Sequence, residues 1–143
     1  MKKIANFTCI VALAALVAGC ATQMTTPFDE SAFQPFVGKG TSTITGQAFQ
    51  KTIGGDVKYG AGDEVSLIPA TPYTTEMIQA WQKSARKNLL LLPPQITPQL
   101  QKYVREVIAD GSGNFEFQNI PAGDYYIVCP IFWSVPIEYG MER

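Results

Sequence analysis

The chain has 143 residues, of which 46% are hydrophobic and 16% are charged, and this length suits one folded domain. It contains no histidine, which excludes serine–histidine triads, cysteine–histidine dyads and histidine-ligated metal sites. The 11 basic and 12 acidic residues give a net charge of −1, so the composition offers no basic patch for nucleic acid. These limits favour a noncatalytic protein without a cofactor.

Residues 1–19 have the pattern of a secretory signal. Lys2 and Lys3 form a basic start, an apolar run follows from Ile10 to Val17, and small residues precede Cys20. The apolar run is far shorter than the roughly 20 residues that a membrane-spanning helix needs. We therefore expect this segment to be removed. Loss of its two lysines reduces the number of basic residues from 11 to 9, and with 12 acidic residues the mature chain has a net charge of −3.

The sequence LVAGC, residues 16–20, resembles the lipobox of bacterial lipoproteins. The resemblance implies that Cys20 becomes the first residue of the mature chain and carries acyl groups such as palmitate. In that family an aspartate after the cysteine retains the protein in the inner membrane, whereas Ala21 follows here. The resemblance thus implies an outer-membrane lipoprotein that faces the periplasm. The alternative is an ordinary cleaved signal with a cysteine present by chance.

Residues 20–40 are predicted to form a tether, because they contain Thr, Pro, Ser and Gly without a clear period. Fully extended, such a segment would reach roughly 65 Å. Phe28, Phe33 and Phe36 are unusual in a flexible linker. They indicate either docking on the domain's own surface, which we prefer, or a short motif that binds a partner.

Cysteine usage excludes a disulfide within the mature domain. Cys9 leaves with the signal and Cys20 is expected to be acylated, so Cys129 has no partner. Cys129 lies among apolar residues, where a free thiol usually behaves as a small buried hydrophobic group. A reactive thiol would need an exposed, electropositive setting.

The domain is expected to span residues 41–143 and to consist mostly of β-strands. Ile44, Gly46 and Ala48 alternate with polar residues, as one face of a strand requires. Similar patterns, bounded by glycines and prolines, recur along the chain. The strands are predicted at residues 41–50, 57–59, 64–68, 102–109, 115–118 and 125–133.

One amphipathic helix is predicted at about residues 74–88. Thr74 or Thr75 can cap its start, and the apolar residues Met77, Trp81 and Ala85 recur every four residues. This spacing forms one apolar stripe, which we expect to cover the sheet. The following run of leucines, residues 89–92, fits either a buried strand or the last turn of the helix.

The segment DGSGN, residues 110–114, joins two predicted strands. Asp, Gly and Asn tolerate the positive φ angles of hairpin turns. Asp110, Ser112 and Asn114 also match the first, third and fifth ligands of a calcium loop. Phe115 and Pro121 occupy the sixth and twelfth positions, where that loop requires glycine and glutamate, so we interpret the segment as a turn and expect no metal there.

Much of the chain, from about Thr41 to Trp133, resembles the carboxypeptidase regulatory-like domain. The resemblance rests on the segments ITGQAF and GGDVKYGAGDEVSLIPATPYT, and on an Asp-x-x-Gly-x-Phe-x-Phe pattern followed by Pro-x-Gly-x-Tyr. It implies a prealbumin-like antiparallel β-sandwich of Greek-key type, here with one inserted amphipathic helix, and a noncatalytic accessory role. The residues that fill the pattern are Asp110, Gly113, Phe115, Phe117, Pro121, Gly123 and Tyr125.

The chain departs from that family by its helical insertion and by ending where a last strand is expected. An unfinished sheet edge exposes unpaired backbone groups that another chain can complete. The leading hypothesis is therefore a lipid-anchored module that binds another envelope protein or itself. Phe132, Trp133 and Tyr139 near this edge are its candidate contacts, since aromatic residues often anchor interfaces.

The alternative hypothesis is a module that binds a small ligand or a glycan. Tyr59, Tyr73 and Trp81 are its candidate stacking platforms. The position of Trp81 on the apolar stripe of the helix favours a place in the core instead. An enzyme of unknown type is the third and most distant hypothesis.

Overall fold

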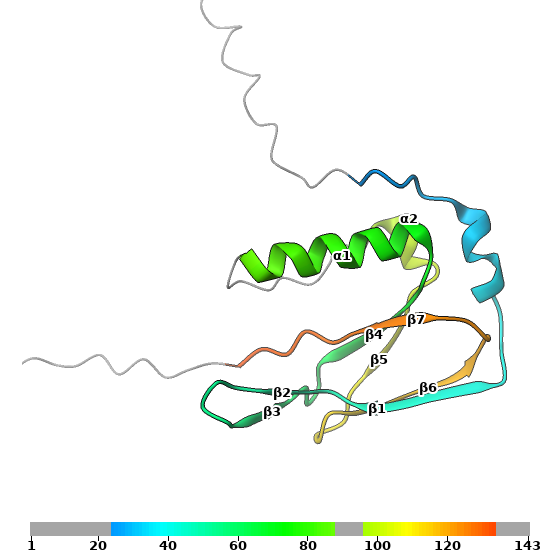
Figure 1. Ribbon diagram of the computed structural model, residues 1–143. Coiled ribbons are helices and arrows are strands. Elements are labelled where there is room, and N and C mark those ends of the chain that lie inside the picture. Colours follow the sequence, from blue (N-terminus) through cyan, green and yellow to red (C-terminus); the bar gives the residue numbers. More distant parts are fainter. Residues whose placement is uncertain (1–23, 88–95, 134–143) are drawn as a thin grey trace, which may run out of the picture.

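The structure, a computed structural model, describes residues 24–87 and 96–133. It is mostly β, with small sheets, one long helix and two short helical segments (Figure 1). The helical elements are the 3₁₀ helix η2 (Glu30–Phe36), α1 (Pro72–Lys87) and α2 (Pro98–Gln101). The strands are β1 (Ser42–Gln47), β2 (Phe49–Lys51), β3 (Val57–Tyr59), β4 (Glu64–Pro69), β5 (Arg105–Ile108), β6 (Asn114–Ile120) and β7 (Tyr125–Val128).

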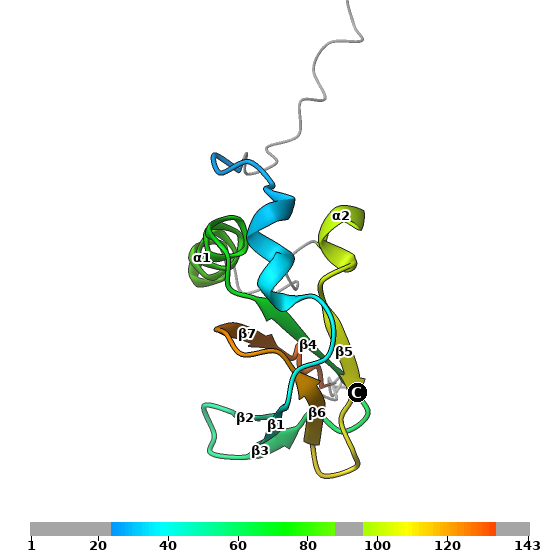
Figure 2. The same cartoon turned by 90° about the vertical axis from the view of Figure 1, so that its right-hand side faces the viewer.

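All strand pairs are antiparallel. β4 is the centre of a three-stranded sheet in the order β5-β4-β7, while β1 pairs with β6 and β2 pairs with β3. The β1–β6 pair lies on one side of the three-stranded sheet and the helices lie on the other, as Figure 2 shows. The molecule is therefore sandwich-like, with a third layer made of helices.

β4 is buried on both faces, and this explains why the domain has two hydrophobic cores. Val65 and Leu67 belong to the core between the sheets, together with Phe117 and Ile120 from β6. Ile68 points the other way, into the core beneath the helices. A strand covered on both faces is buried continuously rather than at every second residue, as residues 65–69 are.

The second core joins the helices to the sheet. Its buried members are Phe33, Ile68, Met77, Ile78 and Leu100. Thr71 and Thr74 fix the start of α1, because the Thr74 hydroxyl donates to the carbonyl of Pro69 at 2.6 Å and accepts from the backbone N–H of Thr71 at 2.8 Å. The prediction of an amphipathic helix on the sheet is confirmed, with Met77 and Ile78 as its buried apolar residues.

Several predicted boundaries differ from the observed ones. β5 begins at Arg105 rather than at residue 102, because Pro98–Gln101 form α2 with Thr97 as its N-cap. β7 ends at Val128 rather than at residue 133. Pro130 follows closely and lacks the N–H that a β ladder requires. The leucine run at 89–92 lies outside the described residues.

The part of the predicted tether that the structure describes is packed on the domain. Phe33 is fully buried, and its ring stacks against those of Phe28 at 4.9 Å and Tyr103 at 4.6 Å. Phe36 packs edge-on against Tyr125, with 5.2 Å between the ring centroids. The three phenylalanines therefore dock on the domain itself. The prediction of an extended tether is wrong for residues 24–36, because burial of these rings outweighs the conformational entropy of an open linker.

Hydrogen bonds to Glu76 hold the start of this segment against α1. The backbone N–H groups of Thr25 and Thr26 donate to the carboxylate, each at 2.7 Å, and the Thr25 hydroxyl donates at 2.8 Å. Hydrogen bonds to these residues lower the pKa of Glu76 to about 2. The largest effect comes from the Thr26 side chain, followed by the backbone and side chain of Thr25 and the backbone of Thr26.

We predict that acid releases residues 24–26 from α1. The pKa of Glu76 is lower in the folded state than its ordinary 4.5, so its contribution to stability is present above pH 4.5 and is lost as the pH falls through about 2. The protection factors of amide hydrogen exchange at Thr25 and Thr26 should fall over this range. Glu76→Gln should show little protection at either amide at every pH, whereas the control Glu64→Gln should behave as the unmodified chain. Equal exchange in Glu76→Gln and the unmodified chain would contradict the role of this carboxylate.

The long first strand is interrupted at Ala48, which separates β1 from β2. The backbone N–H of Ala48 donates to the carbonyl of Gly113 at 2.8 Å, and its carbonyl accepts from Gly60 at 3.0 Å. Gly113 has a φ of 80°, and a Cβ there would lie 2.4 Å from the carbonyl oxygen of Ala48. The close approach of three chain segments therefore requires a glycine at 113.

We predict that Gly113→Ala destabilises the domain by at least about 1–2 kcal/mol, the cost of the left-handed backbone alone, with the steric clash in addition. Gly111→Ala is the matched control, because a Cβ on Gly111 meets nothing within 4 Å. Denaturant unfolding should separate the two variants. Equal stabilities would show that the turn adapts.

Cys129 is half-buried and packs against the core between the sheets. Burial, and to a lesser degree the nearby Asp63, raise the pKa of its thiol, as expected for a structural cysteine rather than a nucleophile. Within the ranges that the structure describes, no helix combines the length and apolarity needed to cross a membrane.

Candidate functional site

The outward face of the β1 and β2 strands carries an exposed row of side chains. Ile44 packs into the core between the sheets, and Ala48 is buried on the same inward face. Because side chains alternate along a strand, the intervening residues point outward. These are Thr45, Gln47, Phe49 and Lys51, and all four are exposed.

Neighbouring strands widen this row. Thr45 lies opposite Glu116 and Gln47 lies opposite Asn114, both on β6. Beyond the interruption at Ala48, Phe49 lies opposite Tyr59 and Lys51 lies opposite Val57, both on β3. We call this surface the outer strip; its residues are Thr45, Gln47, Phe49, Lys51, Val57, Tyr59, Asn114 and Glu116.

The aromatic part of the outer strip is its most unusual feature. Phe49 is 58% exposed and Tyr59 is 50% exposed. Residues directly opposite each other on antiparallel strands place their Cβ atoms roughly 5 Å apart, so the two side chains lie beside each other. Ile53 in the turn between β2 and β3 is fully exposed as well. Large apolar side chains gathered on a protein surface usually mark a binding site.

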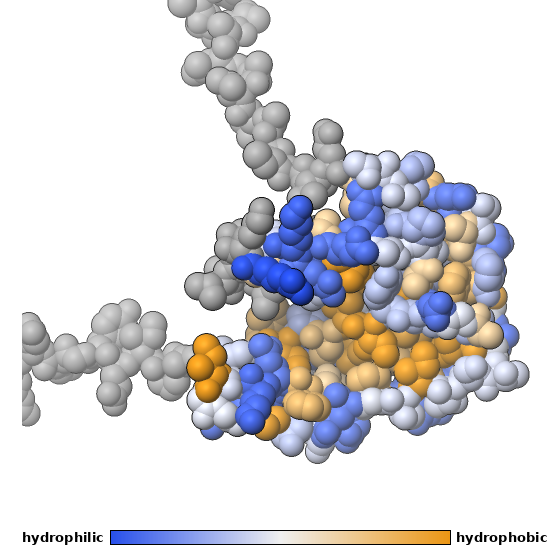
Figure 3. Space-filling view, viewed as in Figure 1, coloured by the Kyte–Doolittle hydropathy of each residue, from blue (hydrophilic) through white to orange (hydrophobic). Residues whose placement is uncertain are grey.

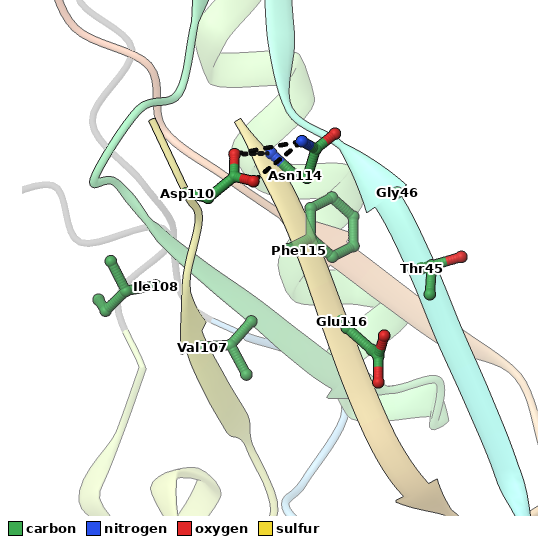
Figure 4. Close-up of a pocket in the computed structure, with 8 residues that line it drawn as sticks. All are labelled: Thr45, Gly46, Val107, Ile108, Asp110, Asn114, Phe115 and Glu116. Carbon is green, nitrogen blue, oxygen red and sulfur yellow. Dashed lines mark hydrogen bonds between the residues drawn. The ribbon is translucent and has the colours of Figure 1, made fainter. Parts of the chain in front are cut away.

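A shallow, open hollow of about 540 Å³ extends from the polar end of the outer strip. Figure 4 shows its walls, which come from β1, β5, β6 and the turn before β6. The Phe115 ring lies over Gly46, where a Cβ would come within 2.5 Å of the ring. The hollow is lined by Thr45, Gly46, Val107, Ile108, Asp110, Asn114, Phe115 and Glu116.

Asp110 closes the turn beside this hollow. One of its carboxylate oxygens accepts the backbone N–H groups of Ser112 and Asn114, both at 2.8 Å, and the Asn114 side chain donates to the other at 3.0 Å (Figure 4). The hydrogen bonds from the Asn114 side chain and backbone, followed by that from Ser112, lower the pKa of Asp110. These hydrogen bonds all lie within residues 110–114, so the interpretation of DGSGN as a turn is confirmed. The described residues contain no group of three or more His, Cys, Asp or Glu side chains that could hold a metal ion.

The residues predicted as glycan platforms do not come together. Tyr59 is exposed on the outer strip, whereas Tyr73 packs against the helical core and lies edge-on to Phe28 at 5.3 Å. Trp81 is half-buried on α1. Sequence reasoning missed Phe49, although its position in a strand that alternates with buried Ala48 is the signal that would have found it.

The residues predicted for protein binding are only partly described. Phe132 is 65% exposed and Trp133 is 42% exposed, which suits an accessible surface. Tyr139 and Cys20 lie outside the described residues. Among the described strands, β7 pairs with β4 alone, so its other edge is open. Figure 3 shows apolar side chains gathered in a band between α1 and the β1–β6 layer, on the side where β7 lies.

No family model and no curated protein matches the sequence. The fold is similar to the crystal structure of a candidate carbohydrate-binding protein from Pseudomonas aeruginosa, with a TM-score of 0.63 and 28% sequence identity over 79% of this chain and 79% of that one. This similarity supports the mostly β, sandwich-like architecture of the chain.

Proposed function

We propose that the protein is a noncatalytic module that binds carbohydrate chains at the outer strip. The similarity to a candidate carbohydrate-binding protein over 79% of each chain is the observation that carries the proposal. This favours the glycan hypothesis over the one that a protein partner is the main ligand. We keep Tyr59 from the predicted platforms and add Phe49, which lies opposite it, in place of Tyr73 and Trp81.

The chemistry of the outer strip suits a sugar. One face of a pyranose ring presents C–H groups that pack on an aromatic ring, and its hydroxyls need polar partners. Phe49 and Tyr59 offer the aromatic surface. Gln47, Thr45 and Asn114 continue along the same face with amide and hydroxyl groups, which both donate and accept hydrogen bonds.

The shape of the outer strip favours a linear chain over a single sugar. Lys51 follows Thr45 by six positions, a length of roughly 20 Å at the usual rise of a strand, which accommodates several sugar rings in a row. The surface is open along its whole length rather than closed into a pocket. An exposed strip binds one sugar weakly and gains affinity with each further ring that it contacts.

The proposal includes attachment to the membrane through lipid on Cys20, since LVAGC has the lipobox pattern. Several acyl chains hold a protein on a bilayer stably, because each buried methylene contributes about 0.8 kcal/mol. An outer-membrane anchor facing the periplasm would place the outer strip within reach of envelope polysaccharides. We retain the prealbumin-type strand order as part of this proposal, on the resemblance of residues 110–125.

A second function, strand addition by a protein partner, is favoured by the open edge of β7. The exposed Phe132 and Trp133 follow that edge and could anchor such a partner. The two functions use different surfaces, so a single set of variants separates them.

Titration calorimetry of the mature chain with a panel of soluble glycans tests the main proposal. The panel contains a neutral glucan, a chitin oligosaccharide, a uronic acid polymer and muropeptides. Saturable binding that strengthens with chain length is expected for at least one member. Flat titrations with every member, together with capture of one envelope protein by cross-linking at residues 130–133, would replace the glycan proposal by the second one.

A further inference from the structure

The chain reaches the domain from the anchor along the outward side of α1. The backbone N–H groups of Thr25 and Thr26 donate hydrogen bonds to the carboxylate of Glu76, which lies on the second turn of that helix. Cys20 precedes Met24 by four residues, a span of at most roughly 14 Å when extended. Lipid on Cys20 would therefore hold α1 close to the bilayer surface, and no long linker would separate them.

The same side of α1 carries two cations. Gln79, Lys83 and Arg86 follow Glu76 at helical spacings of three and four, so they share one face, and all three are exposed. Together with Gln82 they line a shallow hollow on the helix surface. Within the described residues, neither Lys83 nor Arg86 forms an ion pair. Figure 3 shows hydrophilic side chains gathered over α1.

The sheets carry most of the negative charge. The strand and turn segments 38–70 and 105–124 contain seven acidic and four basic residues, a net charge of −3. The helical segments 24–36, 72–86 and 98–104 contain three acidic and three basic residues, a net charge of zero. An anionic surface therefore repels the sheets more than the helical layer.

We propose that the face of α1 bearing Gln79, Lys83 and Arg86 rests on anionic phospholipid headgroups beside the anchor. The inference depends on the lipid attachment proposed for Cys20. Each lysine or arginine near an anionic membrane contributes a factor of roughly five to binding, enough to orient a protein that the lipid already holds. The outer strip then points away from the bilayer, because the helices and the β1–β6 pair lie on opposite sides of the central sheet (Figure 2).

Headgroup quenching on vesicles tests this orientation. The full-length chain is expressed with its leader and purified from membranes, and intact mass shows whether Cys20 carries lipid. It is then inserted into vesicles of phosphatidylcholine with about one-third phosphatidylglycerol. A fluorophore is placed at Gln79→Cys on α1 or at Thr43→Cys on β1, each in a Cys129→Ala background, and the lipid headgroups carry the quencher.

We expect quenching several-fold stronger at position 79 than at position 43. The pair Lys83→Gln and Arg86→Gln should reduce the difference to the smaller one that the anchor alone maintains, whereas the matched pair Lys39→Gln and Lys58→Gln in the sheets should leave it intact. Equal quenching at both positions, or a difference unchanged by loss of Lys83 and Arg86, would overturn the contact of this face with the headgroups. A mature chain without lipid by mass would overturn the anchor and this orientation with it, while leaving the glycan titrations unaffected.

Discussion

Replacing Phe49 with alanine should weaken binding of a linear oligosaccharide about tenfold, and Tyr59→Ala should have a similar effect. An aromatic residue at the centre of a binding surface usually contributes more than 1 kcal/mol, and 1.4 kcal/mol corresponds to a factor of ten in affinity. Both side chains are at least half exposed, so neither replacement should unfold the domain. Calorimetric titration with the best ligand of the panel measures the effect.

The matched control for these variants is Phe132→Ala. Phe132 is 65% exposed, comparable with Phe49, but it follows the open edge of β7 rather than lying on the outer strip. It should leave sugar binding unchanged. The opposite pattern, in which Phe132→Ala abolishes binding and the variants at 49 and 59 do not, would assign the ligand to the edge of β7.

Phe33→Ala should destabilise the domain by about 3–5 kcal/mol, the usual cost of removing a fully buried phenylalanine. Its ring is 0% exposed and is enclosed by Phe28, Tyr103 and the residues of the helical core. Chemical denaturation of the mature chain gives the free energy of unfolding.

Val37→Ala is the control for that variant, because Val37 belongs to the same segment and is 56% exposed. Its effect should stay within about 0.5 kcal/mol. A small effect of Phe33→Ala would mean that residues 24–36 behave as the tether which their composition suggested, and that their packing contributes little to stability.

The strands and α1 were predictable because they depend on local periodicity. Alternation around Ile44 and helical spacing around Met77 both reflect burial of one face, which the structure confirms. The turn at Asp110 was predictable for a similar reason, since its hydrogen bonds lie within five residues. The end of β7 was missed, although Pro130 was the local signal for it.

The role of the segment before β1 could not be predicted from its composition. Its stability depends on contacts distant in sequence: Thr25 with Glu76, Glu30 with Tyr103 at 2.7 Å, and Phe33 with the helical core. The outer strip was hidden for the same reason. Phe49 and Tyr59 become neighbours only through the register of β2 with β3, and neither strand has more than three residues.

The most direct test of the carbohydrate proposal is an NMR titration of the isotope-labelled mature chain with an oligosaccharide that binds in the calorimetric panel. We predict that the largest shift changes fall on the outer strip, at Phe49, Tyr59, Gln47 and Thr45, and that the amides of α1 stay unchanged. Changes confined to β7 and residues 129–133, with an undisturbed outer strip, would contradict the proposal and favour binding at the open edge.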